Sequence, residues 1–119
     1  KLVTGVQTCA LPISENSVNY YNKVGDTLGG VSKIENSYRL FMVPGMSHCR
    51  GGEGTDTFDM LAALERWVEQ GKAPDSIPAS RVVDGKTVRT RPLCPYPQEA
   101  VYKGSGSTDD AANFACRVR

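Results

Sequence analysis

The sequence predicts part of an α/β layer, in which a helix, one core strand, a loop with the only histidine and a second helix follow one another. The strand is predicted over residues 38–43, where the apolar run YRLFMV ends sharply at Pro44-Gly45. Both helices are predicted from apolar residues that recur every three or four positions. Because one strand cannot form a sheet, these elements need partners that the sequence lacks, and we expect a piece cut from a longer α/β domain.

The first helix is predicted over residues 15–30. Asn16 or Ser17 can cap its start, and the pair Gly29-Gly30 is typical of a helix end. Its apolar residues fall close to one face of the helix, which predicts that this face is buried. They are Val18, Tyr21, Val24 and Leu28.

The second helix is predicted over residues 55–70. Thr55 is the expected N-cap, and Asp56 and Asp59 lie near the positive end of the helix dipole. Gly71 stands where a helix C-cap is expected. The apolar residues make a broad stripe, which predicts packing against a sheet. They are Phe58, Leu61, Leu64, Trp67 and Val68.

Residues 72–119 are rich in proline and polar residues, and they are predicted to be irregular and extended. One feature within them indicates regular structure. The pair Asp84-Gly85 lies between residues 81–83 and 87–90, which is a strong hairpin signal.

Three of the four cysteines, Cys49, Cys94 and Cys116, lie beyond residue 14. A disulfide between Cys94 and Cys116 would close a loop of about 23 residues and contribute about 3 kcal/mol in the chain-entropy model. The odd cysteine indicates a partner outside the sequence. A zinc site is disfavoured, because the chain has no CxxC pair and only one histidine.

Composition excludes several classes of protein. The chain is 39% hydrophobic and 23% charged, which is typical of a globular domain. Its net charge of +1 gives no electrostatic reason to bind nucleic acid or an anionic membrane. No apolar run is long enough to span a bilayer.

The first fourteen residues are predicted to be foreign to the protein. Residues 3–13, VTGVQTCALPI, resemble the translation of a common short-read sequencing adapter in one reading frame. We therefore expect residues 1–14 to be an artefact that includes Cys9, and residues 15–119 to be the natural chain. The alternative interpretation is that residues 3–13 form a real first strand.

The only histidine, His48, lies in the glycine-rich loop PGMSHCRGGEG that follows the core strand. Functional sites of α/β sheets form in the loops at the carboxyl ends of strands. In α/β hydrolases the triad residues follow one another as serine, acid and histidine, and a histidine after the last core strand fits this order.

Several motifs together resemble the tannase and feruloyl esterase family of α/β hydrolases. They are NSVNYYNKV, YRLFMVPGMSHC, LERWVEQGKAPDSI, RPLCPYP and YKGSGSTDDAANFAC. The resemblance implies that His48 is the general base of a serine esterase. It implies that Cys49 forms a disulfide with an upstream cysteine beside the serine, and that Cys94 pairs with Cys116. It implies no cofactor and no metal in this part of the chain.

The resemblance implies that the triad acid lies on the loop before the NSVNYY helix, where adapter-like residues stand, so the acid has no counterpart in this sequence. Asp26, Asp56 and Asp59 are not assigned to that role, because of their places in or after the helix. The nucleophile lies outside the sequence as well.

We therefore expect the carboxyl-terminal part of a serine carboxylic ester hydrolase that acts on aromatic esters such as feruloyl or galloyl esters. The piece alone is expected to be inactive, and the parent protein is expected to be periplasmic or secreted. The alternative is a small disulfide-stapled binding module in which His48 is structural.

Overall fold

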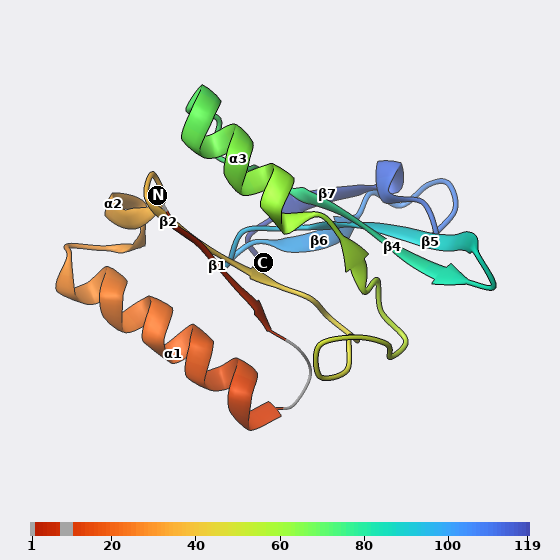
Figure 1. Ribbon diagram of the computed structural model, residues 1–119, viewed down its shortest axis with the longest axis horizontal. Helices are drawn as coiled ribbons and strands as arrows, with labels where there is room; N and C mark the ends of the chain where they lie inside the picture. The colour runs from red at the N-terminus through yellow and green to blue at the C-terminus, as the bar shows by residue number, and fades with distance from the viewer. Residues whose placement is uncertain (1, 8–10) are drawn as a thin grey trace.

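The computed structural model describes the backbone of residues 2–7 and 11–119, and the side chains from Ser14 onward. The chain forms a mixed α/β structure in which strand β2 lies between a helical layer and a layer rich in strands (Figure 1). The elements are β1 (Leu2–Gln7), α1 (Leu11–Thr27), α2 (Val31–Ile34), β2 (Tyr38–Met42), β3 (Thr57–Phe58), α3 (Met60–Gln70), β4 (Ile77–Val83), β5 (Lys86–Leu93), β6 (Glu99–Tyr102), the 3-10 helix η1 (Ala111–Asn113) and β7 (Phe114–Arg117).

Strand β2 is buried on both faces, as predicted for a core strand. Leu40 belongs to a cluster formed with α1 and α2, whereas Phe41 and Val43 belong to a second cluster formed with α3, β4 and β5. Successive side chains of a strand point to opposite faces, so this alternation follows directly from the apolar run. The predicted strand is confirmed, with its last residue at Met42 rather than Val43.

Both edges of β2 are also covered. On one edge β1 pairs with it in parallel, from Leu2 opposite Tyr38 onward. On the other edge Phe41 forms an antiparallel bridge with Pro95, and the Tyr96 N–H donates to the Leu40 carbonyl at 2.7 Å. Strand β2 is therefore held by neighbours on every side, and the loop that follows it starts from a fixed point.

Helix α1 begins earlier than the sequence indicates. It starts at Leu11, so Asn16 and Ser17 lie inside the helix and the prediction that one of them caps it is wrong. Leu28 lies beyond the end of the helix and is exposed, because the chain turns there toward α2, a short helix that was not predicted. The buried face of α1 is centred on Tyr21.

Helix α3 begins later than predicted. Its N-cap is Asp59, whose side chain accepts a hydrogen bond from the Ala62 N–H at 2.9 Å. Thr55 is buried in the preceding loop and is not the cap, because the chain first forms the short strand β3. Gly71 ends the helix in the left-handed conformation, with φ of 70°, as predicted.

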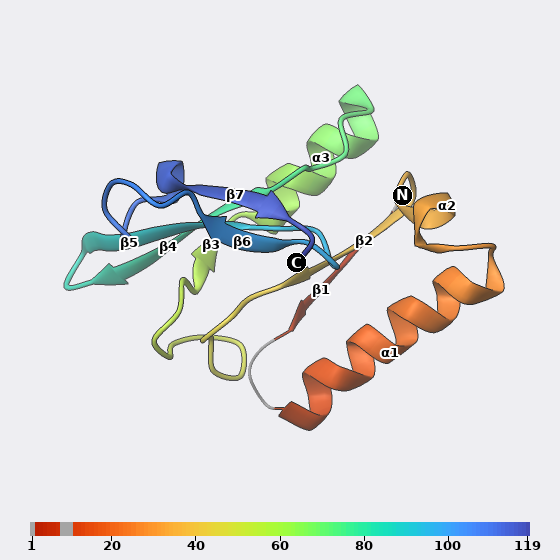
Figure 2. The same cartoon turned by 180° about the vertical axis from the view of Figure 1, so that it is seen from behind.

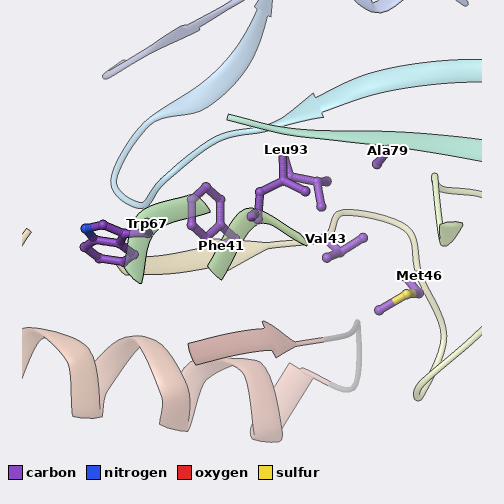
Figure 3. Packing of buried hydrophobic residues seen from close by; sticks show 8 residues of the cluster. Phe41, Val43, Met46, Trp67, Ala79 and Leu93 are labelled. Carbon is purple, nitrogen blue, oxygen red and sulfur yellow. The ribbon is translucent and has the colours of Figure 1, made fainter. Parts of the chain in front are cut away.

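The apolar stripe of α3 is narrower than predicted. Trp67 is buried in the cluster (Figure 3). Leu64 packs against the same cluster, whereas Leu61 and Val68 remain 64% and 58% exposed. Phe58 contributes from β3 rather than from the helix. The helix therefore packs through one narrow face, and its flank is open in this chain.

The prediction of an irregular carboxyl-terminal part is wrong, because this part forms strands β4 to β7. The hairpin between β4 and β5 is confirmed, and both turn residues have positive φ, 50° at Asp84 and 74° at Gly85. The prolines led to the wrong prediction, since Pro78 and Pro92 stand directly opposite each other in this ladder. Residues opposite each other at a non-hydrogen-bonded pair do not donate to one another, so two prolines are tolerated there.

The predicted disulfide between Cys94 and Cys116 is present, with an S–S distance of 2.01 Å. It joins the end of β5 to β7, across a sequence separation of 22 residues. Replacing both cysteines by serine is expected to lower the free energy of unfolding by about 3 kcal/mol, because the unfolded chain regains the entropy of an open loop. Urea denaturation of the 119-residue chain measures this change.

The control for that variant is Cys49→Ser, which removes an exposed free thiol and should change the free energy of unfolding by less than about 0.5 kcal/mol. A loss below about 1 kcal/mol in the double variant would show that the bridge does not constrain the unfolded chain as the entropy model assumes.

Candidate functional site

His48 lies in the loop of residues 44–54, which we call the His48 loop and which connects the carboxyl end of β2 to β3 (Figure 2). Its only fully buried side chain is that of Met46, which packs in the same cluster as Phe41. The imidazole itself is exposed. The loop is therefore anchored at one residue and presents its histidine to solvent.

Backbone hydrogen bonds close the His48 loop at two levels. The Ser47 N–H donates to the Gly51 carbonyl at 2.9 Å, directly beside the histidine. The Gly54 N–H donates to the Gly45 carbonyl at 2.8 Å, at the base of the loop. These bonds give the segment its own framework, although it lies on the surface.

Two glycines are required for this closure. A Cβ atom at Gly52 would overlap the Gly45 carbonyl oxygen, and a Cβ atom at Gly54 would overlap the Pro44 carbonyl oxygen. Only residues without a side chain allow the two arms of the loop to approach so closely. The glycine-rich composition therefore has a packing reason.

His48 and Cys49 are in direct contact at the loop tip. The Cys49 Sγ atom lies 3.0 Å from Nδ1 of His48, and the thiol is free and exposed. Cys49 has a φ of 68°, in the left-handed region that a residue with a side chain seldom adopts. Within the described residues, no carboxylate is hydrogen-bonded to the imidazole.

Two aspartates near the loop, Asp56 and Asp59, have structural roles. Asp56 accepts a hydrogen bond from the Gly51 N–H at 2.7 Å and so holds the far arm of the loop. Asp59 caps α3. Asp26 lies exposed on α1.

Two arginines of the β4–β5 hairpin form hydrogen bonds to Glu53, near the end of the His48 loop. Nη1 of Arg81 donates to the Glu53 carbonyl oxygen at 3.0 Å and to the Glu53 carboxylate at 2.7 Å. Nη1 of Arg89 donates to the same carbonyl oxygen, also at 3.0 Å. Nε of Arg89 in turn donates to Asp109 at 2.7 Å.

These contacts shift the proton affinities of the groups involved. The hydrogen bond from Arg81, followed by its charge, holds the pKa of Glu53 below its ordinary value of 4.5. The same bond raises the pKa of Arg81. The hydrogen bond from Arg89 is the main reason why the pKa of Asp109 is lowered. Both carboxylates are therefore ionised, and Arg81 is charged, at neutral pH.

A cleft of about 750 Å³ lies behind the base of the His48 loop. It is lined by residues of α1, β2, β5 and the segment after Cys94, among them Val18, Met42, Gly45 and Tyr96. His48 is not among its lining residues, so the cleft does not open at the imidazole. In size it is comparable to small-molecule sites, but it lies apart from the histidine.

The described residues hold neither a metal centre nor a membrane span. No group of three or more His, Cys, Asp or Glu side chains in the described part of the chain is arranged to hold a metal ion. None of the described helices is both long enough and apolar enough to cross a bilayer.

A comparison with models of protein families shows to which family the chain belongs. The family model described as tannase and feruloyl esterase matches residues 5–117, which is nearly the whole chain. The chain belongs to the tannase and feruloyl esterase family. The resemblance of the chain to this family, first seen in the motifs around His48 and around the Cys94–Cys116 pair, is thereby confirmed.

Curated members of the family are similar to the chain over one part of their length. Mono(2-hydroxyethyl) terephthalate hydrolase from Piscinibacter sakaiensis is 52% identical over 104 residues, which cover 85% of this chain and 17% of that protein. A probable feruloyl esterase from Arthroderma benhamiae is 42% identical over 106 residues, which cover 86% of this chain and 20% of that protein. The chain therefore spans about a fifth of the length of these relatives.

Solved structures of the family share the fold. An esterase from Aspergillus oryzae superposes with a TM-score of 0.80 at 33% identity, over 87% of this chain and 24% of that chain. Feruloyl esterase B from the same organism gives 0.78 at 33% identity with the same coverage. The mixed α/β structure described above thus matches part of known esterases.

Of the site residues expected from the sequence, the structure places His48 and Cys49 together at the loop tip and joins Cys94 to Cys116. Cys9 lies outside the described residues. The roles of Arg81 and Arg89 were not predicted. The sequence shows one arginine on each side of the predicted turn, but the register shift that places them opposite each other, and their shared contact with Glu53, depend on the fold.

Proposed function

We propose that this chain is the carboxyl-terminal part of a serine carboxylic ester hydrolase with an α/β-hydrolase fold, and that His48 is its general base. The observation that carries the proposal is the position of His48 on a tight loop directly after β2, a strand buried on both faces, within a member of this family. Relatives named as a feruloyl esterase and a terephthalate ester hydrolase support aromatic esters as substrates.

In the proposed mechanism, His48 removes the proton from an upstream serine as the serine oxygen attacks the ester carbonyl. The imidazolium then gives that proton to the leaving alcohol, and an acyl-enzyme remains. Water attacks the acyl-enzyme as His48 takes its proton, and the imidazolium then returns that proton to the serine oxygen as the free acid is released. The exposed position of His48 on its loop leaves the ring accessible to such partners.

Cys49 is proposed to form a disulfide with a cysteine beside that serine. The support is its free, exposed thiol at the loop tip, in contact with the imidazole. Such a bridge would tie the nucleophile to the histidine loop although the two lie far apart along the chain, and so fix their geometry. The Cys94–Cys116 disulfide supports an oxidising compartment, hence a periplasmic or secreted parent protein.

Residues 1–14 are proposed to be derived from a sequencing adapter. The support is the resemblance of residues 3–13 to a translated adapter. The family match from residue 5 and the pairing of β1 with β2 favour the alternative, in which these residues form a real first strand. The triad acid is expected on the loop after that strand, where residues 8–10 lie outside the described part of the chain.

The proposal is tested by recovering the intact gene upstream of the codons for MVPGMSHC and assaying its product. The full-length protein is expected to hydrolyse at least one of methyl ferulate, methyl gallate and mono(2-hydroxyethyl) terephthalate, and its gene to encode a Cys-Ser pair upstream. If the genomic sequence instead encodes VTGVQTCALPI behind a start codon, without a nucleophile, the esterase proposal fails. The chain is then a small disulfide-stapled binding module with a structural histidine.

A further inference from the structure

A single peptide group closes the base of the His48 loop. It joins Glu53 to Gly54, and the structure holds it at both ends. Its N–H, which belongs to Gly54, donates to the Gly45 carbonyl at 2.8 Å. Its carbonyl, which belongs to Glu53, accepts from both Arg81 and Arg89 at 3.0 Å. At the base of the loop, this peptide group therefore links one arm to the other and to the β4–β5 hairpin.

The two ends of this peptide group act on each other. Cationic donors at a carbonyl oxygen draw electron density toward that oxygen, which makes the N–H of the same amide a better donor. The hydrogen bonds from the arginines to the Glu53 carbonyl therefore strengthen the hydrogen bond from the Gly54 N–H to the Gly45 carbonyl. Loss of the guanidinium groups would weaken the closure of the loop without changing any residue within it.

The like charges of Arg81 and Arg89 lie close together, which is unfavourable unless both groups interact with the same acceptor. Arg81 and Arg89 stand directly opposite each other in the β4–β5 ladder. Like charges at such cross-strand pairs destabilise a sheet. Here both charges converge on Glu53, and Arg89 is further paired with Asp109. These contacts therefore bring the guanidinium groups of Arg81 and Arg89 together at the peptide group that closes the base of the His48 loop.

We infer that Arg81 and Arg89 are positioning residues that hold the His48 loop closed through the Glu53 carbonyl. Neither guanidinium group contacts the imidazole in the structure, so their action on His48 is indirect. The importance of this role for ester hydrolysis rests on the proposed function, whereas the role itself is a property of this chain. It makes the β4–β5 hairpin a support for the histidine rather than a separate tail.

The test uses the 119-residue chain labelled with ¹³C and ¹⁵N, in which His48 is the only histidine and gives the only imidazole signals. In the double variant Arg81→Met, Arg89→Met, we expect the amide exchange rate of Gly54 to rise by about tenfold or more, as local opening becomes easier. The His48 signals are expected to broaden or split. Amides of the β4–β5 ladder serve as the internal control and should keep their exchange rates within about twofold.

Three further variants distinguish the charge of the arginines from their donor geometry, from the Glu53 carboxylate and from the loss of any exposed arginine. Arg81→Lys with Arg89→Lys keeps both charges but not the forked donors, and should restore the loop only in part. Glu53→Gln keeps the carbonyl and removes the carboxylate charge, so both readouts should stay near those of the unchanged chain. Arg119→Met removes an arginine from another exposed ion pair, that with Glu99, and should leave the loop unchanged.

The inference is overturned if the double variant folds with unchanged Gly54 exchange and unchanged His48 signals. It is also overturned if the single variants Arg81→Met and Arg89→Met both unfold the whole chain, because the arginines would then support the fold in general. The proposed function fails separately, when His48→Ala leaves the activity of the full-length esterase intact whatever the loop readouts show.

Discussion

Replacing His48 by alanine in the full-length esterase is expected to lower kcat/KM by at least about 10³-fold, since the serine then has no base to take its proton. We propose that the nucleophile and the oxyanion hole lie outside the 119 residues. We therefore expect the 119-residue chain to hydrolyse aromatic esters no faster than an equal concentration of free imidazole. Steady-state kinetics with the ester panel described above measure both effects.

Two controls make this result specific to catalysis. Added imidazole should restore part of the activity of His48→Ala, whereas a histidine that only supports the fold would not be replaced in this way. Asp26→Asn should retain full activity, because Asp26 lies exposed on α1. Turnover by the 119-residue chain that disappears with His48→Ala would show that the machinery is complete in this sequence, contrary to our proposal.

Replacing Trp67 by alanine is expected to lower the free energy of unfolding by about 3–5 kcal/mol, the usual cost of deleting a buried aromatic side chain. Trp67 is 1% exposed and packs in the cluster that also holds Phe41, Ile77 and Leu93. Its ring is further covered by the guanidinium group of Arg39, at 5.7 Å from the ring centroid. Urea denaturation followed by circular dichroism measures the change.

The matched control lies on the same helix. Leu61 is 64% exposed, so Leu61→Ala should change the free energy of unfolding by no more than about 0.5 kcal/mol. Trp67→Phe keeps an aromatic ring in the cavity and should fall between the two. A loss below about 1 kcal/mol in Trp67→Ala would mean that the cluster around Phe41 does not carry the stability of the chain.

Local patterns were enough to predict β2, the turn at Asp84-Gly85 and the end of α3, because each depends on a few neighbouring residues. The apolar run of β2 had no polar interruption after Arg39, and Gly71 was the natural residue for a left-handed C-cap. The position of His48 after a buried strand followed from these elements.

Other features depend on distant residues, and the sequence could not reveal them. Thr55, Asp56 and Asp59 were all plausible at the start of a helix, and the pairing of β3 with β4 moved that start to Asp59. The prolines of residues 72–119 predict an irregular chain, because prolines disfavour strands. Whether a strand tolerates them depends on its register, which only the partner strand fixes. The contact of Arg81 with Glu53 could not be predicted either, because it also depends on distant residues.

The burial of β2 on both faces has a consequence for the evolution and engineering of this family. A strand enclosed on each side cannot adjust to a larger or smaller neighbour without shifting toward the opposite layer, because interiors are close-packed. Tyr21 on α1 packs against the face that carries Leu40, while Trp67 packs in the cluster that holds Phe41. Substitutions of Tyr21 on α1 are therefore expected to shift β2 and, with it, the start of the His48 loop.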